Sequence, residues 1–156
     1  MSLNLQGANG ATLALNSGAF ANGTTASGFT NAAAINYAIN GRFYNKGIVA
    51  SVPLVIEPGT GINPVLPQAL VTLAAGQACS FAIILDAAGV FTVNQGDIVA
   101  VGSPTPVAPA PAGKAIVGAI KVVNATNPFI PGTTLFSAAG VTTTYVNLAQ
   151  HPGTSI

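Results

Sequence analysis

The chain has 156 residues, of which only four are basic and three acidic. An average soluble domain is about one-quarter charged, so this deficit excludes proteins that work through a strong electrostatic field. With a net charge of +1 there is no basic patch for phosphates or for an anionic membrane surface, and we expect neither nucleic acid nor a membrane among the partners.

The first 34 residues are rich in Ala, Gly, Asn and Thr and contain no charged side chain. A segment of this composition has too little apolar surface to order itself, so residues 1–34 are predicted to form a low-complexity, uncharged N-terminal arm. An extended segment that packs on a partner is the alternative. No basic stretch followed by an apolar core opens the chain, and we therefore expect no secretion signal.

From residue 35 onward the pattern is that of β-strands, and residues 35–156 are predicted to form one β domain. The clearest signal is Asn40-Gly41 between two alternating segments, because a type I′ hairpin turn needs positive φ at both central positions. In that register three cross-strand pairs share one face of the hairpin: Ile39 with Arg42, Tyr37 with Tyr44, and Ile35 with Lys46.

Short apolar runs between Gly, Pro and Asn residues predict the remaining strands. They lie around Leu70–Leu73, Cys79–Leu85, Val90–Val93, Ile98–Val101, Ile116–Val123 and Val141–Leu148. The sequences at 86–89 and 137–140 predict matching turns, each opened by a side-chain acceptor and closed by glycine. No helical period persists beyond two turns, so the predicted fold class is all-β: a single antiparallel β-sandwich or barrel-like domain with an extended N-terminal arm.

Residues 103–113 contain four prolines and cannot form a central strand, because proline donates no ladder hydrogen bond. They are predicted to form a stiff crossover loop between two parts of a sandwich. A polyproline ligand for an aromatic groove is the functional alternative.

The titratable side chains are too few and too scattered to suggest a reaction. Asp86, Asp97 and Glu57 fit turn, strand-start and loop positions, and His151 lies near the C-terminus without further metal ligands around it. Cys79 shares a strand face with apolar residues and fits a core position better than that of a nucleophile. We therefore predict no enzymatic activity, no catalytic residue, no metal and no cofactor.

One cluster is a candidate partner-contact face, made of Tyr37, Arg42, Tyr44 and Lys46 on the predicted hairpin. Tyrosine and arginine are favoured in interfaces, so this face could bind an acidic surface or a sugar. The alternative is an ordinary edge hairpin whose long side chains lie over apolar neighbours while their charged ends reach water.

A chain with so few charges must cover its surface with neutral polar groups or bury it against copies and partners. A closed, cyclic oligomer is the expected form, because exposed strand edges otherwise pair without control.

Several stretches from about residue 35 to residue 152 also resemble a known family. They are 37–44 (YAINGRFY), 85–90 (LDAAGV) with 95–96 (QG), 111–114 (PAGK), 116–122 (IVGAIKV), 129–135 (FIPGTTL), and 140–142 (GVT) leading to 151–152 (HP). Together they resemble the capsid decoration (cement) and head-fibre proteins of tailed bacteriophages.

The resemblance implies a β-rich, commonly trimeric structural virion protein. Such a protein is made in the host bacterial cytoplasm, binds the outside of the head and bridges subunits of the major capsid protein. A head-fibre or tail-associated module that recognises a host-surface carbohydrate is the alternative, with the hairpin face as its contact.

Overall fold

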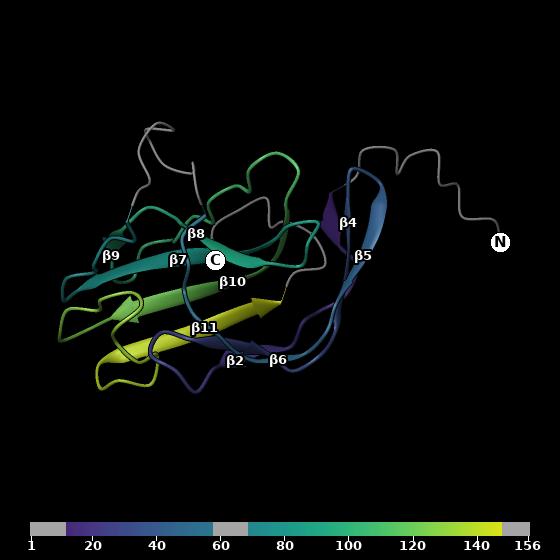
Figure 1. The fold of residues 1–156 in the computed structure, drawn as a ribbon. Helices are drawn as coiled ribbons and strands as arrows, with labels where there is room; N and C mark the ends of the chain where they lie inside the picture. The colour runs from purple at the N-terminus through teal and green to yellow at the C-terminus, as the bar shows by residue number, and fades with distance from the viewer. Residues whose placement is uncertain (1–11, 58–68, 148–156) are drawn as a thin grey trace.

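The computed structural model describes residues 12–57 and 69–147, and over these ranges the chain is built from strands and turns (Figure 1). The strands form three antiparallel sheets in a sandwich-like arrangement, which confirms the predicted all-β class; the sheets do not close into a barrel. No helix in these ranges is long and apolar enough to cross a membrane.

The largest sheet contains five strands in the order β11-β10-β7-β8, with β9 paired to the start of β7. Their bounds are β7 Gln77–Leu85, β8 Phe91–Gln95, β9 Val99–Ala100, β10 Ala115–Asn124 and β11 Val141–Asn147. Every residue of β7 after Gln77 is buried, because both faces of this sheet are covered. These strands agree with five of the six predicted runs to within a few residues.

The sixth run, Leu70–Leu73, was predicted as a strand and is not one. Only Leu73 pairs, through an isolated bridge to Phe129. Its backbone N–H and C=O bond the C=O and N–H of Phe129 at 3.0 and 2.9 Å, and both side chains are fully buried. The segment therefore anchors a loop to the core instead of adding to a sheet.

A second sheet has the order β1-β4-β5, with β1 Leu13–Ala14, β4 Ile35–Ile39 and β5 Arg42–Lys46. Strands β4 and β5 form the predicted hairpin in the predicted register. Asn40 and Gly41 have φ values of 50° and 76°, as a type I′ turn requires. The hairpin prediction is confirmed.

The third sheet, β2-β3-β6, shows that the predicted arm is wrong for residues 12–34. Its strands are β2 Phe20–Asn22, β3 Phe29–Asn31 and β6 Val49–Val52. Phe20 and Phe29 are buried and meet Phe91 of the large sheet edge-on. Two phenylalanines placed over a neighbouring sheet supply apolar burial that the overall composition of the segment did not predict. Residues 1–11 lie outside the described ranges.

The main hydrophobic core lies between the large sheet and the two smaller ones, and all three sheets contribute side chains to it. Residues 103–113 run between β9 and β10 along the opposite face of the large sheet, where Val107 and Ala110 pack on Ala82, Ile84 and Ile116. The proline-rich segment forms no strand, as predicted. It covers one face of a single sheet, however, and does not cross between two sheets.

Candidate functional site

The predicted partner-contact face of the hairpin points into the molecule. The Tyr37 side chain is 1% exposed and stacks on Tyr44 with ring centroids 5.5 Å apart. Its hydroxyl donates a 2.8 Å hydrogen bond to the backbone carbonyl of Asp86. Burial raises the pKa of Tyr37, and electrostatic interactions with Asp86 and Tyr44 raise it further, so the phenol stays a neutral donor. Tyr37 therefore cannot contact a partner in the folded chain.

The two cations of that face have different surroundings. The Lys46 ammonium lies 5.3 Å from the centroid of the Phe91 ring, a cation–π distance. Its aliphatic stem passes near the turn at Gly89, as expected for a long side chain over apolar neighbours. Arg42, at the other end of β5, remains exposed. The structure thus brings Tyr37, Tyr44 and Lys46 together as packing, with Arg42 at the solvent edge.

The opposite face of the same sheet is the one that solvent reaches. Phe43 is 62% exposed and Leu15, just after β1, is 45% exposed. Leu13, Ala38 and Phe43 are in register across the three strands, and the small Ala38 is shielded between its two larger neighbours. In the alternating sequence both faces of β5 carry an aromatic residue, so alternation alone could not decide which face is buried.

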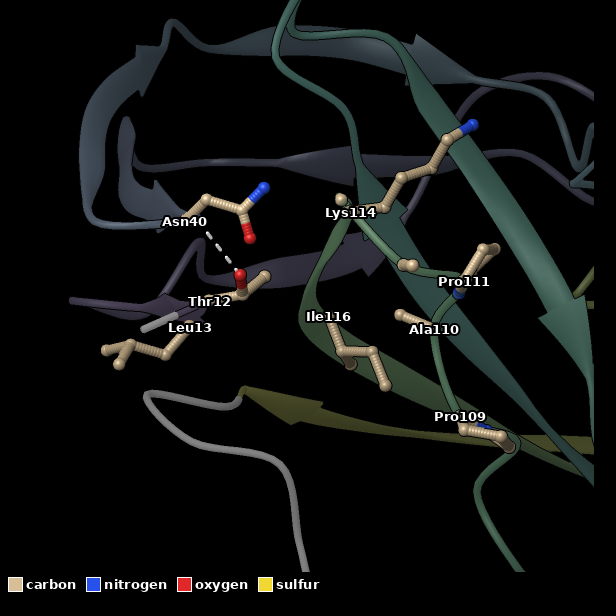
Figure 2. Close-up of a pocket in the computed structure, with 10 residues that line it drawn as sticks. Thr12, Leu13, Asn40, Pro109, Ala110, Pro111, Lys114 and Ile116 are labelled. Carbon is tan, nitrogen blue, oxygen red and sulfur yellow. Dashed lines mark hydrogen bonds between the residues drawn. The ribbon is translucent and has the colours of Figure 1, made fainter. Parts of the chain in front are cut away.

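A pocket of about 490 Å³ lies between the β4–β5 turn and the proline-rich segment. Figure 2 shows Thr12, Leu13 and Asn40 on one wall and Pro109 to Lys114 on the other, with Ile116 between them. The backbone N–H of Asn40 donates a 3.1 Å hydrogen bond to the Thr12 hydroxyl. The Lys114 side chain extends away from this wall (Figure 2), which leaves a lining of apolar groups, one amide and one hydroxyl.

The Lys114 ammonium forms an ion pair with Glu57, which is 3% exposed. The Thr92 hydroxyl donates to the other carboxylate oxygen of Glu57, so the buried charge is both paired and hydrogen-bonded, as burial of a carboxylate demands. Sequence reasoning assigned Glu57 to a loop and missed this pair. The two residues are 57 positions apart, and no local pattern links them.

The remaining candidate reactive groups also have structural surroundings. Cys79 is fully buried, and burial raises the pKa of its thiol to about 12, which keeps it un-ionised and unreactive. Asp86 opens the predicted turn: its carboxylate accepts hydrogen bonds from the N–H groups of Ala88 and Val90 at 2.8 and 2.9 Å. His151 lies outside the described residues. Within them, no group of three His, Cys, Asp or Glu side chains could hold a metal ion.

No family model matches the chain, and no curated protein or solved structure matches it either.

Proposed function

We propose that this chain is a structural protein of a tailed-bacteriophage virion that decorates the outside of the capsid and bridges subunits of the major capsid protein. The observation that carries the proposal is an exposed face with no charge on it, on the outer side of the β1-β4-β5 sheet. Leu15 and Phe43 lie there beside Asn36 and Asn45. Exposed apolar side chains that gather on one face of a protein mark contact surfaces, and we infer such a contact for this face. The likeness of residues 35–152 to decoration proteins suggests the partner.

The chemistry of the buried groups supports a non-enzymatic role. The Glu57 carboxylate forms an ion pair with Lys114 and accepts a hydrogen bond from Thr92. The Asp86 carboxylate accepts two backbone hydrogen bonds within a turn. A carboxylate engaged in this way serves the fold, whereas an acid–base catalyst must reach a substrate. We therefore assign no reaction, metal or cofactor to the chain, and no nucleic acid or membrane as a partner.

The carbohydrate-recognition alternative loses its main support. It assigned the sugar contact to Tyr37, Tyr44 and Arg42, but Tyr37 is buried and its hydroxyl is bonded to the Asp86 carbonyl. We accordingly place the protein on the virion surface as a decoration protein, after synthesis in the host cytoplasm.

The test is attachment of the purified chain to heads of the encoding phage that lack it, at about 0.05 and about 0.5 M salt. We expect the bound amount to change less than about threefold between the two salts, because exposed charges contribute little to the contact. Phe43→Glu should abolish attachment, whereas Val101→Glu, at another exposed apolar residue, should not. A loss of several orders of magnitude at the higher salt, or no effect of Phe43→Glu, contradicts the proposal.

A further inference from the structure

Strand β11 lies at one edge of the large sheet (Figure 1) and presents seven uncharged residues, Val141–Asn147. Proteins usually protect such an edge with lysine, proline or a bulge, or cover it with another segment. The other long edge of this sheet is covered: Val55 and Glu57 exchange 2.8 Å hydrogen bonds with Val93 of β8. The edge strand β5 carries Arg42 and Lys46. Within residues 12–57 and 69–147, no other strand pairs with the outer edge of β11, and β11 itself contains no lysine or proline.

The register shows which backbone groups of β11 face outward. The N–H of Ala125 donates to the carbonyl of Gly140 at 2.8 Å, one step beyond the pairing of Asn124 with Val141. Because hydrogen-bonded and non-hydrogen-bonded pairs alternate in an antiparallel ladder, Thr143 and Tyr145 turn their N–H and C=O groups away from β10. Among the described residues, no backbone hydrogen bond outside that ladder involves residues 142–147.

Side-chain hydrogen bonds to β2 hold β11 in place. The Tyr145 hydroxyl and the Thr143 hydroxyl both donate to Oδ1 of Asn22, at 2.7 and 3.2 Å. Oδ1 of Asn147 accepts a 2.9 Å hydrogen bond from the N–H of Phe20. The strand is therefore fixed on β10 and β2 before any partner arrives, which lowers the entropic cost of adding a strand.

We propose that β11 is a self-association edge, at which two copies of this chain pair their β11 strands antiparallel about a two-fold axis at Thr144. This register pairs the outward groups of Thr143 with those of Tyr145 in the other copy, and it uses the whole strand. The two large sheets then form one continuous sheet. The contact goes beyond the proposed function, because it joins free copies and does not require the capsid.

Charge favours a second copy as the occupant. In a two-fold contact each side chain near the axis meets its own copy, so any charge there would repel itself. Residues 141–147 carry none, and Thr144 opposite Thr144 is a favourable cross-strand pair. The nearest cation in register is Lys121 on β10. In the paired sheet, Lys121 of one chain would lie three strand spacings, about 14 Å, from Lys121 of the other chain. This distance exceeds the screening length of about 8 Å.

This edge is complementary to itself, whereas a trimer needs contact between two different surfaces. We therefore expect the free protein to pair in twos, in place of the three-fold state that the resemblance implied. Strand pairing alone buries less than the roughly 1,200 Å² of a stable interface, so the pairing should depend on concentration. Light scattering or sedimentation from about 1 μM to about 1 mM should show the mass of the 15.3 kDa chain doubling.

Charge variants at the axis test the geometry. Thr144 is exposed, so Thr144→Lys should fold normally but remain monomeric, because two ammonium groups would meet at the axis. Thr144→Glu should do the same, and an equimolar mixture of the two should regain the doubled mass. Thr133→Lys adds the same charge on an exposed loop and should pair like the original chain. The regained mass excludes misfolding as the reason for the loss.

A disulfide reports the register. Thr144 and its copy form a non-hydrogen-bonded pair with Cα atoms about 4.5 Å apart, within disulfide range, so Thr144→Cys should cross-link into dimers on oxidation. In Thr142→Cys the two sulfurs lie about four residues apart along the strands, roughly 14 Å, and should not cross-link. The proposal is overturned by a chain that stays monomeric at about 1 mM, or by an oligomer whose mass Thr144→Lys leaves unchanged. Equal cross-linking of both cysteine variants overturns the register.

Discussion

Replacing Phe20 by alanine measures how firmly residues 12–34 belong to the fold. The Phe20 side chain is 5% exposed, and its ring meets those of Phe29 and Phe91 edge-on at centroid distances of 5.8 and 6.4 Å. Removing a buried phenylalanine side chain costs about 3–5 kcal/mol, out of about 5–15 kcal/mol for a whole domain. If this segment were a free arm, the substitution would cost almost nothing.

A methyl group added at Gly118 tests the same contact from the large sheet. A Cβ at that position would lie 2.5 and 2.7 Å from two carbons of the Phe20 ring and 3.1 Å from the Val146 carbonyl oxygen. Overpacking of this kind costs about 1–3 kcal/mol. In the double variant the ring is absent, so most of that penalty should disappear. The double variant should then unfold at nearly the same free energy as Phe20→Ala alone.

Urea unfolding followed by far-ultraviolet circular dichroism gives the three free energies of unfolding. Gly47→Ala is the matched control, because no atom lies within 4 Å of a Cβ at Gly47 and the expected change is below about 0.5 kcal/mol. A cost below about 1 kcal/mol for Phe20→Ala, or strict additivity with Gly118→Ala, would refute the docking of β2 on the large sheet.

Two further substitutions test the buried polar and titratable groups. Lys114→Ala leaves the Glu57 carboxylate buried without its cation and should lower the free energy of unfolding by about 3–5 kcal/mol, with part of the loss recovered in Lys114→Arg; a cost near zero in urea unfolding would contradict the ion pair. The second concerns Cys79, whose pKa rises from 9.0 to about 12 on folding. Its stabilising contribution is complete below pH 9 and is lost as the pH rises toward 12, by at most about 1.4 kcal/mol per pH unit. Melting temperatures of Cys79→Ala should therefore fall less steeply above pH 9 than those of the original chain, and equal slopes would contradict this account.

The features that sequence reasoning predicted well are the local ones. The Asn40-Gly41 turn fixes its own φ values and with them the register of β4 and β5. The turn at Asp86 needs only its side-chain acceptor and the positive φ of Gly89. Each depends on residues within a few positions of one another, so the information is contained in the local sequence.

The features that sequence reasoning missed depend on tertiary contacts. Nothing near Phe20 indicates that its ring will lie over Gly118, about a hundred positions later in the chain. Which face of the β4–β5 hairpin is buried also depends on tertiary contacts. Its alternation predicted one face bearing Tyr37 and Tyr44 but not whether that face would be buried, because the opposite face carries Phe43. Only the placement of the sheet against the core decides this, and it turned the candidate contact face inward.

The location of the charges leaves much of the surface without electrostatic protection. Of seven charges, Glu57 and Lys114 neutralise each other and Lys46 lies over the Phe91 ring. Soluble domains usually avoid association through many mixed surface charges, and this chain has already used several of its few within the fold. Its exposed Phe43 lies on a face without charged side chains, and its β11 edge has no electrostatic protection against pairing. Selection against aggregation would remove such features from a protein that works alone, so their presence together favours a protein that functions within an assembly.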